Sequence, residues 1–306
     1  MTLSASPLFD TVLIVGIGHI GSSVAVNIRQ AGLARRLLAS DKSADHEAIA
    51  VSLGHVDAAL PLEEAAAQAD LIMLCAPVGA VEAICAKIAP HLKDNCIVSD
   101  VGSTKLSVLQ AMERQLGKNV HAVPAHPIAG IEKSGPTQAI PALFQNRWAV
   151  ITPSPHASEE AVQKVQALWA GFGAKVTNMT AEHHDQVLAV TSHLPHLIAY
   201  CIVDTANQLG QDLKQEVIKY SAGGFRDFTR IAGSDPVMWR DVFLNNRDAV
   251  LEILGRFSED LSDLQRAIRR GDGDLLESKF TETRAIRKTI EDAGQAGQFD
   301  PTEKPE

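Results

Sequence analysis

The chain has 306 residues, a net charge of −9 and 45% apolar residues. That length predicts about two domains, and the apolar share is large enough for a substantial core, which argues against an intrinsically disordered chain. The negative charge, with no long cluster of Lys or Arg, argues against a nucleic-acid-binding protein, although a single buried Arg could still bind a small acidic substrate.

Cysteine spacing and the amino-terminal stretch predict the compartment. The four cysteines show no Cys-x-x-Cys spacing, which favours reduced thiols in a core. Residues 1–11 lack a basic segment followed by an apolar one, and no later run is expected to be long enough to span a bilayer. We therefore expect a soluble, cytoplasmic protein that does not contact a membrane.

The first half of the chain alternates short β-rich runs with helical patterns. This alternation predicts βαβ units and a parallel sheet covered on both faces, an α/β fold. The expected strands are 12–17, 37–40, 71–76, 96–100, 121–125 and 148–152.

A glycine pattern joins the first expected strand to the first expected helix. It reads Gly16-Ile17-Gly18-His19-Ile20-Gly21. In this position the first glycine permits a tight turn, the second lets the backbone approach a pyrophosphate, and the third lets the helix pack closely on the strand. The pattern predicts a Rossmann-type dinucleotide-binding domain over residues 1–155; the alternative is a glycine-rich turn of another α/β fold.

Asp41 ends the second expected strand, twenty residues after Gly21. An acidic residue there accepts the ribose hydroxyls of NAD. Lys42 follows directly and could tolerate the 2′-phosphate of NADP, so NADP stays open as a second cofactor. The candidate cofactor-binding residues are Gly16, Gly18, His19, Ile20, Gly21, Asp41, Lys42, Ala76 and Pro77.

His126 stands directly before Pro127, after an apolar run and before a loop rich in small residues. The proline holds His126 in an extended backbone and stops the strand from continuing. We therefore expect the imidazole to be displayed at a strand end rather than buried. On these grounds alone a structural and a catalytic histidine are equally open.

The pattern changes after residue 155. One further expected strand, 174–178, is followed by helical periodicity over 180–209, 236–269 and 275–293. Residues 156–295 are thus expected to form an all-helical domain that packs across a homodimer interface, and the polar residues 296–306 a disordered tail. His183, His184, His193 and His196 could suggest zinc, but there is no His-Glu-x-x-His spacing and Pro195 disturbs the helical face, so no metal site is expected.

Four separated motifs follow the glycine pattern: SDVGSTK at 99–105, HPIAGIEKSG at 126–135, TSHLPHLIAY at 191–200 and SAGGFRDFTRIAGSDPVMW at 221–239. Together they resemble the prephenate and arogenate dehydrogenases of tyrosine biosynthesis, also called cyclohexadienyl dehydrogenases. The resemblance runs from Val12 to about Ala293 and implies the minimal, monofunctional form. It implies transfer of a hydride to NAD, loss of the ring carboxylate as CO2, and aromatisation of the ring of prephenate or arogenate.

The resemblance also implies roles for individual residues. His126 accepts the proton of the substrate hydroxyl, and Ser103 hydrogen-bonds both that histidine and the hydroxyl; the alternative for Ser103 is a cap on the helix that begins near Thr104. Arg230 holds the ring carboxylate through its planar guanidinium, the alternative being a surface ion pair with Asp227 or Asp235.

Further residues are expected around the substrate by resemblance: His193, Arg226, Ser234, Trp239, and Glu132, which gates the pocket or contacts the partner subunit. Ile131 stands where many prephenate-using relatives carry threonine, and it cannot donate a hydrogen bond to the pyruvyl side chain. Prephenate and arogenate therefore both stay open.

Two other functions fit part of the sequence. A β-hydroxyacid or imine reductase also joins a Rossmann domain to a helical one, but those families use a lysine or aspartate on the helical domain. A nucleotide-sensing protein without turnover would have no need of His126, Ser103 and Arg230 together.

Overall fold

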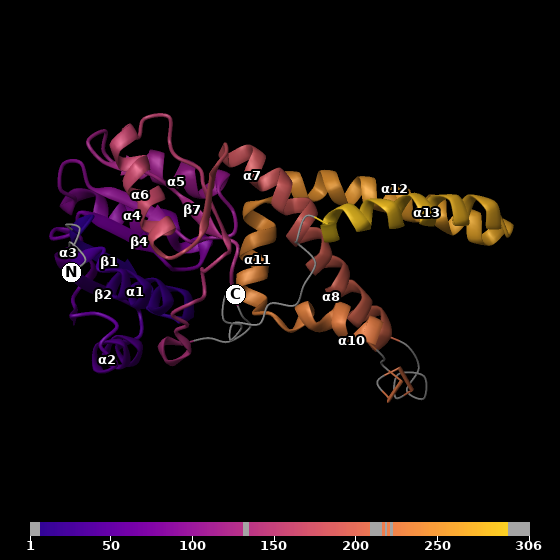
Figure 1. Ribbon diagram of the computed structural model, residues 1–306, viewed down its shortest axis with the longest axis horizontal. Helices are drawn as coiled ribbons and strands as arrows, with labels where there is room; N and C mark the ends of the chain where they lie inside the picture. The colour runs from indigo at the N-terminus through magenta and orange to yellow at the C-terminus, as the bar shows by residue number, and fades with distance from the viewer. Residues whose placement is uncertain (1–6, 131–134, 209–215, 218, 221–222, 293–306) are drawn as a thin grey trace. The chain divides into compact units, whose positions relative to one another are not determined.

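The computed structural model of the chain describes residues 7–130, 135–208, 216–217, 219–220 and 223–292 (Figure 1). The chain divides into two compact units, Met1–Arg247 and Asp248–Glu306. The expected tail, residues 296–306, lies outside the described residues.

The first unit begins with a six-stranded parallel sheet in the order β3-β2-β1-β4-β5-β6. Its strands are β1 (Phe9–Val15), β2 (Ala34–Ser40), β3 (Ala58–Ala59), β4 (Leu71–Leu74), β5 (Ile97–Asp100) and β6 (His121–Ala122). The expected parallel sheet is confirmed for the strands expected at 12–17, 37–40, 71–76 and 96–100, whereas the strand expected at 148–152 lies in a second sheet. The strand order reverses between β1 and β4, and ligands of open α/β sheets bind beyond the carboxyl ends of the strands at such a point.

Helices cover this sheet, and its strands are apolar where they are buried, at residues 12–15 of β1, 37–39 of β2 and 71–74 of β4. They are α1 (His19–Ala31), α2 (Ala44–Ser52), α3 (Leu62–Ala66), α4 (Val81–Ile88) and α5 (Leu106–Gln115). Alternate strand residues, among them Leu13, Ile72 and Val98, form one buried cluster with α3, α4 and α5. Figure 1 shows α1 on the opposite side of the sheet from α4 and α5.

A second, three-stranded sheet holds His126. It consists of β7 (Ala125–Pro127), antiparallel to β8 (Trp148–Ile151), which is parallel to β9 (Lys175–Asn178); α6 (Glu159–Gly171) connects β8 to β9. The single strand expected at 121–125 is therefore wrong: β6 and β7 belong to different sheets, because Pro124 between them has no N–H to continue the first ladder.

The setting of His126 also differs from the expectation. Pro127 does end β7, but His126 pairs with Val150 in the middle of that strand and is only 8% exposed. The expectation of a displayed imidazole is wrong, because the pairing with β8 and the covering residues come from distant parts of the chain. The domain boundary at residue 155 stays a prediction; α6 and β9 continue the second sheet beyond it.

A long helical segment follows β9. It comprises α7 (Ala181–Leu188), a π-helical turn (Ala189–His193) and α8 (Leu194–Asn207). Pro195 lies in the first turn of α8 and has no N–H to offer the preceding turn, which fits the wider turn at this point. Among the described residues, α10 (Gly223–Thr229), a 3-10 turn (Arg230–Gly233) and α11 (Pro236–Asn245) follow.

The span Ala181–Asn207 is 27 residues long and apolar enough to cross a membrane by length and composition. The expectation that no run reaches this length is therefore wrong. Such a helix is weak evidence for a membrane protein, and this one carries the buried polar side chains His184, Asp185 and His193.

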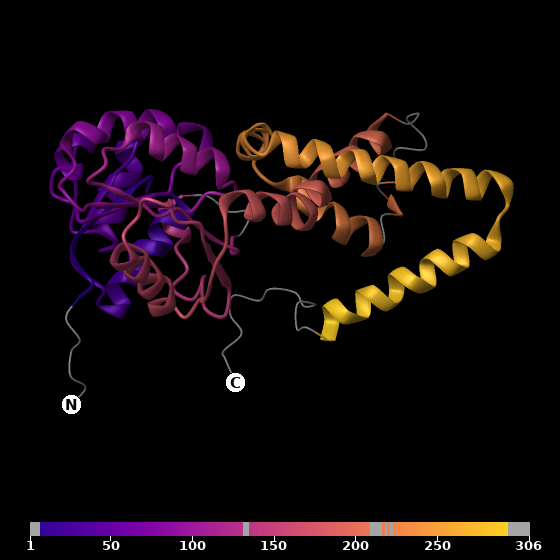
Figure 2. The ribbon, with the colours of Figure 1, turned by 90° about the horizontal axis from the view of Figure 1, so that it is seen from above.

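The second unit contains α12 (Arg247–Arg270), apart from its first residue, and α13 (Gly273–Asp292). They are joined at Gly271, whose φ is 68°, and Figure 2 shows α13 leaving the end of α12 at an angle. No residue of α13 is buried. Both helices expose large apolar side chains: Leu251, Leu261, Ile268, Leu275, Phe280, Ile286 and Ile290.

Candidate active site

The glycine pattern forms the turn between β1 and α1. Gly16 has a φ of 91°, and a Cβ there would lie 2.8 Å from the carbonyl oxygen of Cys75. A Cβ on Gly21 would collide with the carbonyl oxygen of Gly16. At Gly18, in contrast, a Cβ would meet no atom of the described residues within 4 Å, and α1 begins without a side-chain cap. Open space beside uncapped N–H groups fits the pyrophosphate of a dinucleotide.

Asp41 follows β2 directly, and its carboxylate lies against this turn. Oδ2 accepts a hydrogen bond from the Ile17 N–H at 2.7 Å, and Oδ1 accepts one from the Ser43 N–H at 2.8 Å. Each carboxylate oxygen can accept a further bond, such as one from a ribose hydroxyl. Lys42, next along the chain, is exposed.

The other predicted cofactor residues lie around the same turn. His19 is buried; its Nδ1 lies 2.7 Å from the Gln138 carbonyl oxygen, and within the described residues its Nε2 has no partner. Burial lowers the pKa of His19. Ile20 is partly buried in the first turn of α1, and Ala76 and Pro77 follow the end of β4, the strand beside β1.

A buried ion pair lies at the end of β5. Lys105 Nζ lies 2.5 Å from both carboxylate oxygens of Asp100 and donates to the carbonyl of Ala125 at 2.8 Å. The same carboxylate accepts the N–H groups of Gly102 and Ala125. Burial raises the pKa of Asp100 and lowers that of Lys105, and each charge partly offsets this effect on the other. The pair therefore ties the loop after β5 to the residue before His126.

Ser103 lies half-buried in that loop. Among the described residues it makes no hydrogen bond to His126, so its catalytic role stays a prediction. The alternative role as a helix cap is wrong: α5 begins at Leu106 without a cap from its own preceding side chain. Asp185 accepts the N–H groups of Lys105 and Leu106 at 2.8 and 3.0 Å instead.

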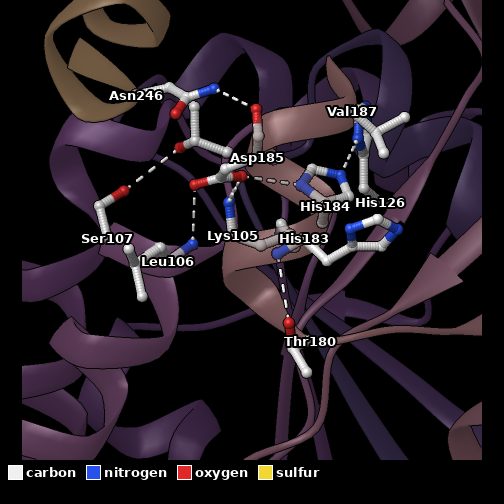
Figure 3. Close-up of polar contacts among 12 residues, drawn as sticks. Lys105, Leu106, Ser107, His126, Thr180, His183, His184, Asp185, Val187 and Asn246 are labelled. Atoms are coloured by element: carbon white, nitrogen blue, oxygen red, sulfur yellow. Dashed lines mark hydrogen bonds and ion pairs between the residues drawn. The ribbon is translucent and has the colours of Figure 1, made fainter. Parts of the chain in front are cut away.

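His126 bonds to a second histidine. Its Nδ1 lies 2.8 Å from Nε2 of His184, whose own Nδ1 lies 2.8 Å from Oδ1 of Asp185 (Figure 3). The rings of the two histidines meet edge to face. Burial, with the positive charges nearby, holds the pKa of His126 well below its usual range, and burial also lowers that of His184. Neither ring is charged at neutral pH, so His126 is available as a base.

His193 and Trp239 form a second buried group. Asn246 donates from its side-chain nitrogen to Nδ1 of His193 at 3.0 Å, and burial lowers the pKa of His193 to about 4. Trp239 stacks on His196, with ring centroids 3.6 Å apart. Within the described residues, Nε2 of His193 and Nε1 of Trp239 are buried without a partner.

Of the predicted residues in the 221–239 motif, Trp239 is buried, Ser234 is half-buried and the two arginines are exposed. Arg230 is exposed at the start of its 3-10 turn. Arg226 is exposed and pairs with Asp227 at 2.9 Å, and Asp235 caps α11. The Ser234 hydroxyl donates to the carbonyl of Ile231 at 2.8 Å. Ile131 and Glu132 lie outside the described residues.

Sequence reasoning did not assign four residues to the site: His184, Asp185, His196 and Asn246. His184 and His196 entered only as zinc ligands to be set aside, and among the described residues no group of three or more His, Cys, Asp or Glu could hold a metal. The partners of His184 and Asp185 lie 58 and 80 residues away, so no local spacing indicated them.

Comparison with known proteins gives matches to both the nucleotide-binding part and the helical part of the chain. A family model described as prephenate dehydrogenase, nucleotide-binding domain, matches residues 24–178, and one described as prephenate dehydrogenase, dimerization domain, matches residues 180–282. Cyclohexadienyl dehydrogenase of Zymomonas mobilis is 37% identical over 285 residues, which cover 92% of this chain and 97% of that protein. Prephenate dehydrogenase of Lactococcus lactis is 34% identical, over 92% of this chain and 77% of that protein.

Solved structures agree. Prephenate dehydrogenase from Aquifex aeolicus, in complex with hydroxyphenyl propionate and NAD+, has a TM-score of 0.86 and 34% identity, over 95% of this chain and 100% of that chain. Arogenate dehydrogenase from Synechocystis has a TM-score of 0.79 and 26% identity, over 92% of this chain and 99% of that chain. These matches in sequence and structure lead to one conclusion: the chain belongs to the prephenate dehydrogenase family.

Proposed function

We propose that this chain is an NAD-dependent dehydrogenase that oxidatively decarboxylates prephenate, arogenate or both, giving 4-hydroxyphenylpyruvate or tyrosine. The observation that carries the proposal is a buried imidazole, His126, kept neutral by its surroundings in the same compact unit as a turn shaped for a dinucleotide. The names of the relatives support both substrates: cyclohexadienyl and prephenate dehydrogenases in sequence, and an arogenate dehydrogenase in structure.

In this reaction His126 handles the proton of the ring hydroxyl. Bound NAD supplies the hydride acceptor. Nε2 of His126 accepts the hydroxyl proton as hydride leaves the ring carbon that bears this hydroxyl. The bond to the ring carboxylate then breaks, CO2 leaves, and its electron pair completes the aromatic ring; the proton returns to the oxygen of the resulting phenol. A base that serves at neutral pH must be uncharged there, which the lowered pKa of His126 ensures.

We assign substrate binding to residues of the sequence motifs. Arg230 pairs with the ring carboxylate, and Ser103 hydrogen-bonds the ring hydroxyl. Nε2 of His193 and Nε1 of Trp239, which have no partner among the described residues, support a polar contact between this group and the substrate. Further proposed substrate-binding residues are Arg226, Ser234, Ile131 and Glu132.

Replacement of Arg230 tests the carboxylate contact. Arg230→Lys keeps the charge but loses the planar fork, and Arg230→Gln loses both. Because Arg230 is exposed, we expect KM to rise modestly in the lysine variant and about 10- to 100-fold in the glutamine variant. The KM for NAD serves as the control and should hardly change. Equal substrate KM values in all three proteins would remove Arg230 from substrate binding.

Assembly and location follow from the same family. The proposed enzyme is a homodimer joined through its helical residues, supported by the apolar side chains exposed on α12 and α13 and by the description of the second family model as a dimerization domain. It works in the cytoplasm, as suits a biosynthetic enzyme. Sedimentation of the purified chain gives the subunit number.

The decisive assay follows the absorbance of reduced nicotinamide. The purified protein is incubated with prephenate or arogenate and with NAD or NADP, and the aromatic product is identified by chromatography. Turnover with at least one substrate and preference for NAD are expected. No reduction with any of the four combinations would overturn the proposal, since a protein that only senses nucleotides would bind NAD without turnover.

A further inference from the structure

We propose that His184 and Asp185 are positioning residues that hold His126 in the tautomer with its proton on Nδ1, leaving the lone pair of Nε2 to accept the substrate's proton. This inference rests on the proposed function of His126 as the base. It concerns a hydrogen-bonded chain, Asp185 to His184 to His126, that lies entirely in buried residues (Figure 3).

The direction of the chain is set at Asp185. Its carboxylate accepts the backbone N–H groups of Lys105 and Leu106. A carboxylate has no hydrogen to give, so Nδ1 of His184, 2.8 Å away, must be the donor. Asp185 is thus the acceptor at one end of the hydrogen-bonded series, and its role determines the donor and the acceptor of each further bond.

The remaining assignments follow ring by ring. A neutral histidine carries one N–H, so His184 with its hydrogen on Nδ1 presents a lone pair at Nε2. That lone pair faces Nδ1 of His126 at 2.8 Å, which must therefore donate. His126 then has its lone pair on Nε2. Within the described part of the chain, this nitrogen has no hydrogen-bond partner.

The opposite tautomer would not work. If His126 carried its hydrogen on Nε2, two lone pairs would face each other across 2.8 Å at His184, and the substrate hydroxyl would meet a donor instead of an acceptor. In serine hydrolases an aspartate holds a histidine in its working tautomer in the same manner. Here a second histidine stands between the carboxylate and the base.

The charges around the chain also favour this arrangement once His126 has taken a proton. His126 faces His184, Lys105 and His193, and His184 faces Asp185, Lys105 and Asp100. The charge of Lys105 is balanced by Asp100. The Asp185 carboxylate is left to stabilise, through His184, the positive charge that forms on His126.

The direct test is the tautomer itself, read without substrate. Nitrogen-15 NMR of histidine-labelled protein at neutral pH distinguishes a ring protonated on Nδ1 from one protonated on Nε2, and the His126→Asn variant identifies the signal of His126. We expect His126 in the Nδ1–H form. Observation of the Nε2–H form would overturn the proposal, whatever the activity of the enzyme.

Variants of His184 test the consequence for catalysis. His184→Phe keeps a ring of similar shape without an acceptor, and His184→Gln restores an acceptor in its side-chain carbonyl. We expect kcat to fall about 100-fold in the phenylalanine variant with an unchanged substrate KM, and the glutamine variant to recover most of it. A structural role alone would give no such recovery.

The matched control is His183→Phe, the neighbouring and exposed histidine of α7, which should leave kcat unchanged. A normal kcat in His184→Phe, or failure of His184→Gln to recover activity while folded by circular dichroism, would overturn the proposal. If His184→Phe does not fold, the NMR measurement and the kcat of His184→Gln still test the proposal. If the wild type turns over neither prephenate nor arogenate, the proposed function fails, and the tautomer measurement separately decides whether the chain sets His126 as inferred.

Discussion

The nucleotide-binding turn and the proton-accepting site of this protein are built in opposite ways. The turn is made of backbone, and its three glycines lie within six consecutive residues, Gly16 to Gly21. The site around His126 is made of side chains that come together across 58 residues. A site of backbone can be found from spacing alone, whereas a site of side chains appears only once the chain has folded.

The largest effect expected on either region is that of His126→Asn. Asparagine keeps a polar side chain of similar size but cannot act as the base, so kcat should fall by roughly 10² to 10⁴ with little change in substrate KM. Steady-state kinetics with either substrate measures this. Near-normal turnover would mean that the buried histidine cluster is structural. In that case only the turn would be a functional site.

Two glycine variants sharpen the description of the turn. Gly21→Ala should destabilise the protein by about 1 to 3 kcal/mol, because the new Cβ collides with the carbonyl of Gly16. The Cβ of Gly18→Ala meets no atom of the described part of the chain within 4 Å, so this variant should keep its melting temperature. Its KM for NAD should rise roughly tenfold, the equivalent of one lost close contact. Equal melting temperatures for the two variants would contradict this assignment of roles.

The histidine cluster should also make stability depend on pH. Burial lowers the pKa values of His126, His184 and His193, the last to about 4. Between pH 6.5 and about 4 the unfolded chain therefore binds more protons than the folded one, so the free energy of unfolding should fall as the pH falls through this window and level off above it. Urea unfolding from pH 5 to pH 8 measures this, and His193→Gln should show a weaker dependence. An equal free energy of unfolding at pH 5 and at pH 8 would contradict the assignment of buried, neutral histidine rings.

The smallest effect is expected at Asp41. Asp41→Ser removes a charge that would repel the 2′-phosphate of NADP, so the ratio of kcat/KM for NAD to that for NADP should narrow by about tenfold or less. The melting temperature of the variant is the control for loss of the hydrogen bonds that Asp41 accepts from Ile17 and Ser43. An unchanged ratio would show that cofactor choice is made elsewhere.

The same contrast explains how much could be predicted from sequence. The first strands of the parallel sheet, the glycine turn and the position of Asp41 follow from apolar runs and short spacings. The separation of β6 from β7, the burial of His126 and the capping of α5 by Asp185 were not foreseen. Each depends on a partner far along the chain, which no local pattern of residues specifies.

The π-helical turn Ala189–His193 between α7 and α8 has a consequence for how this protein can change over time. Adding or removing one residue in a helix rotates everything beyond it by about 100° and shifts it by about 1.5 Å. The turn thus sets the angular offset between His184 on α7 and His196 on α8. Substitutions there can accumulate singly, but an insertion or deletion would swing one histidine away from its neighbours, so the length of this segment should be inherited more strictly than its sequence.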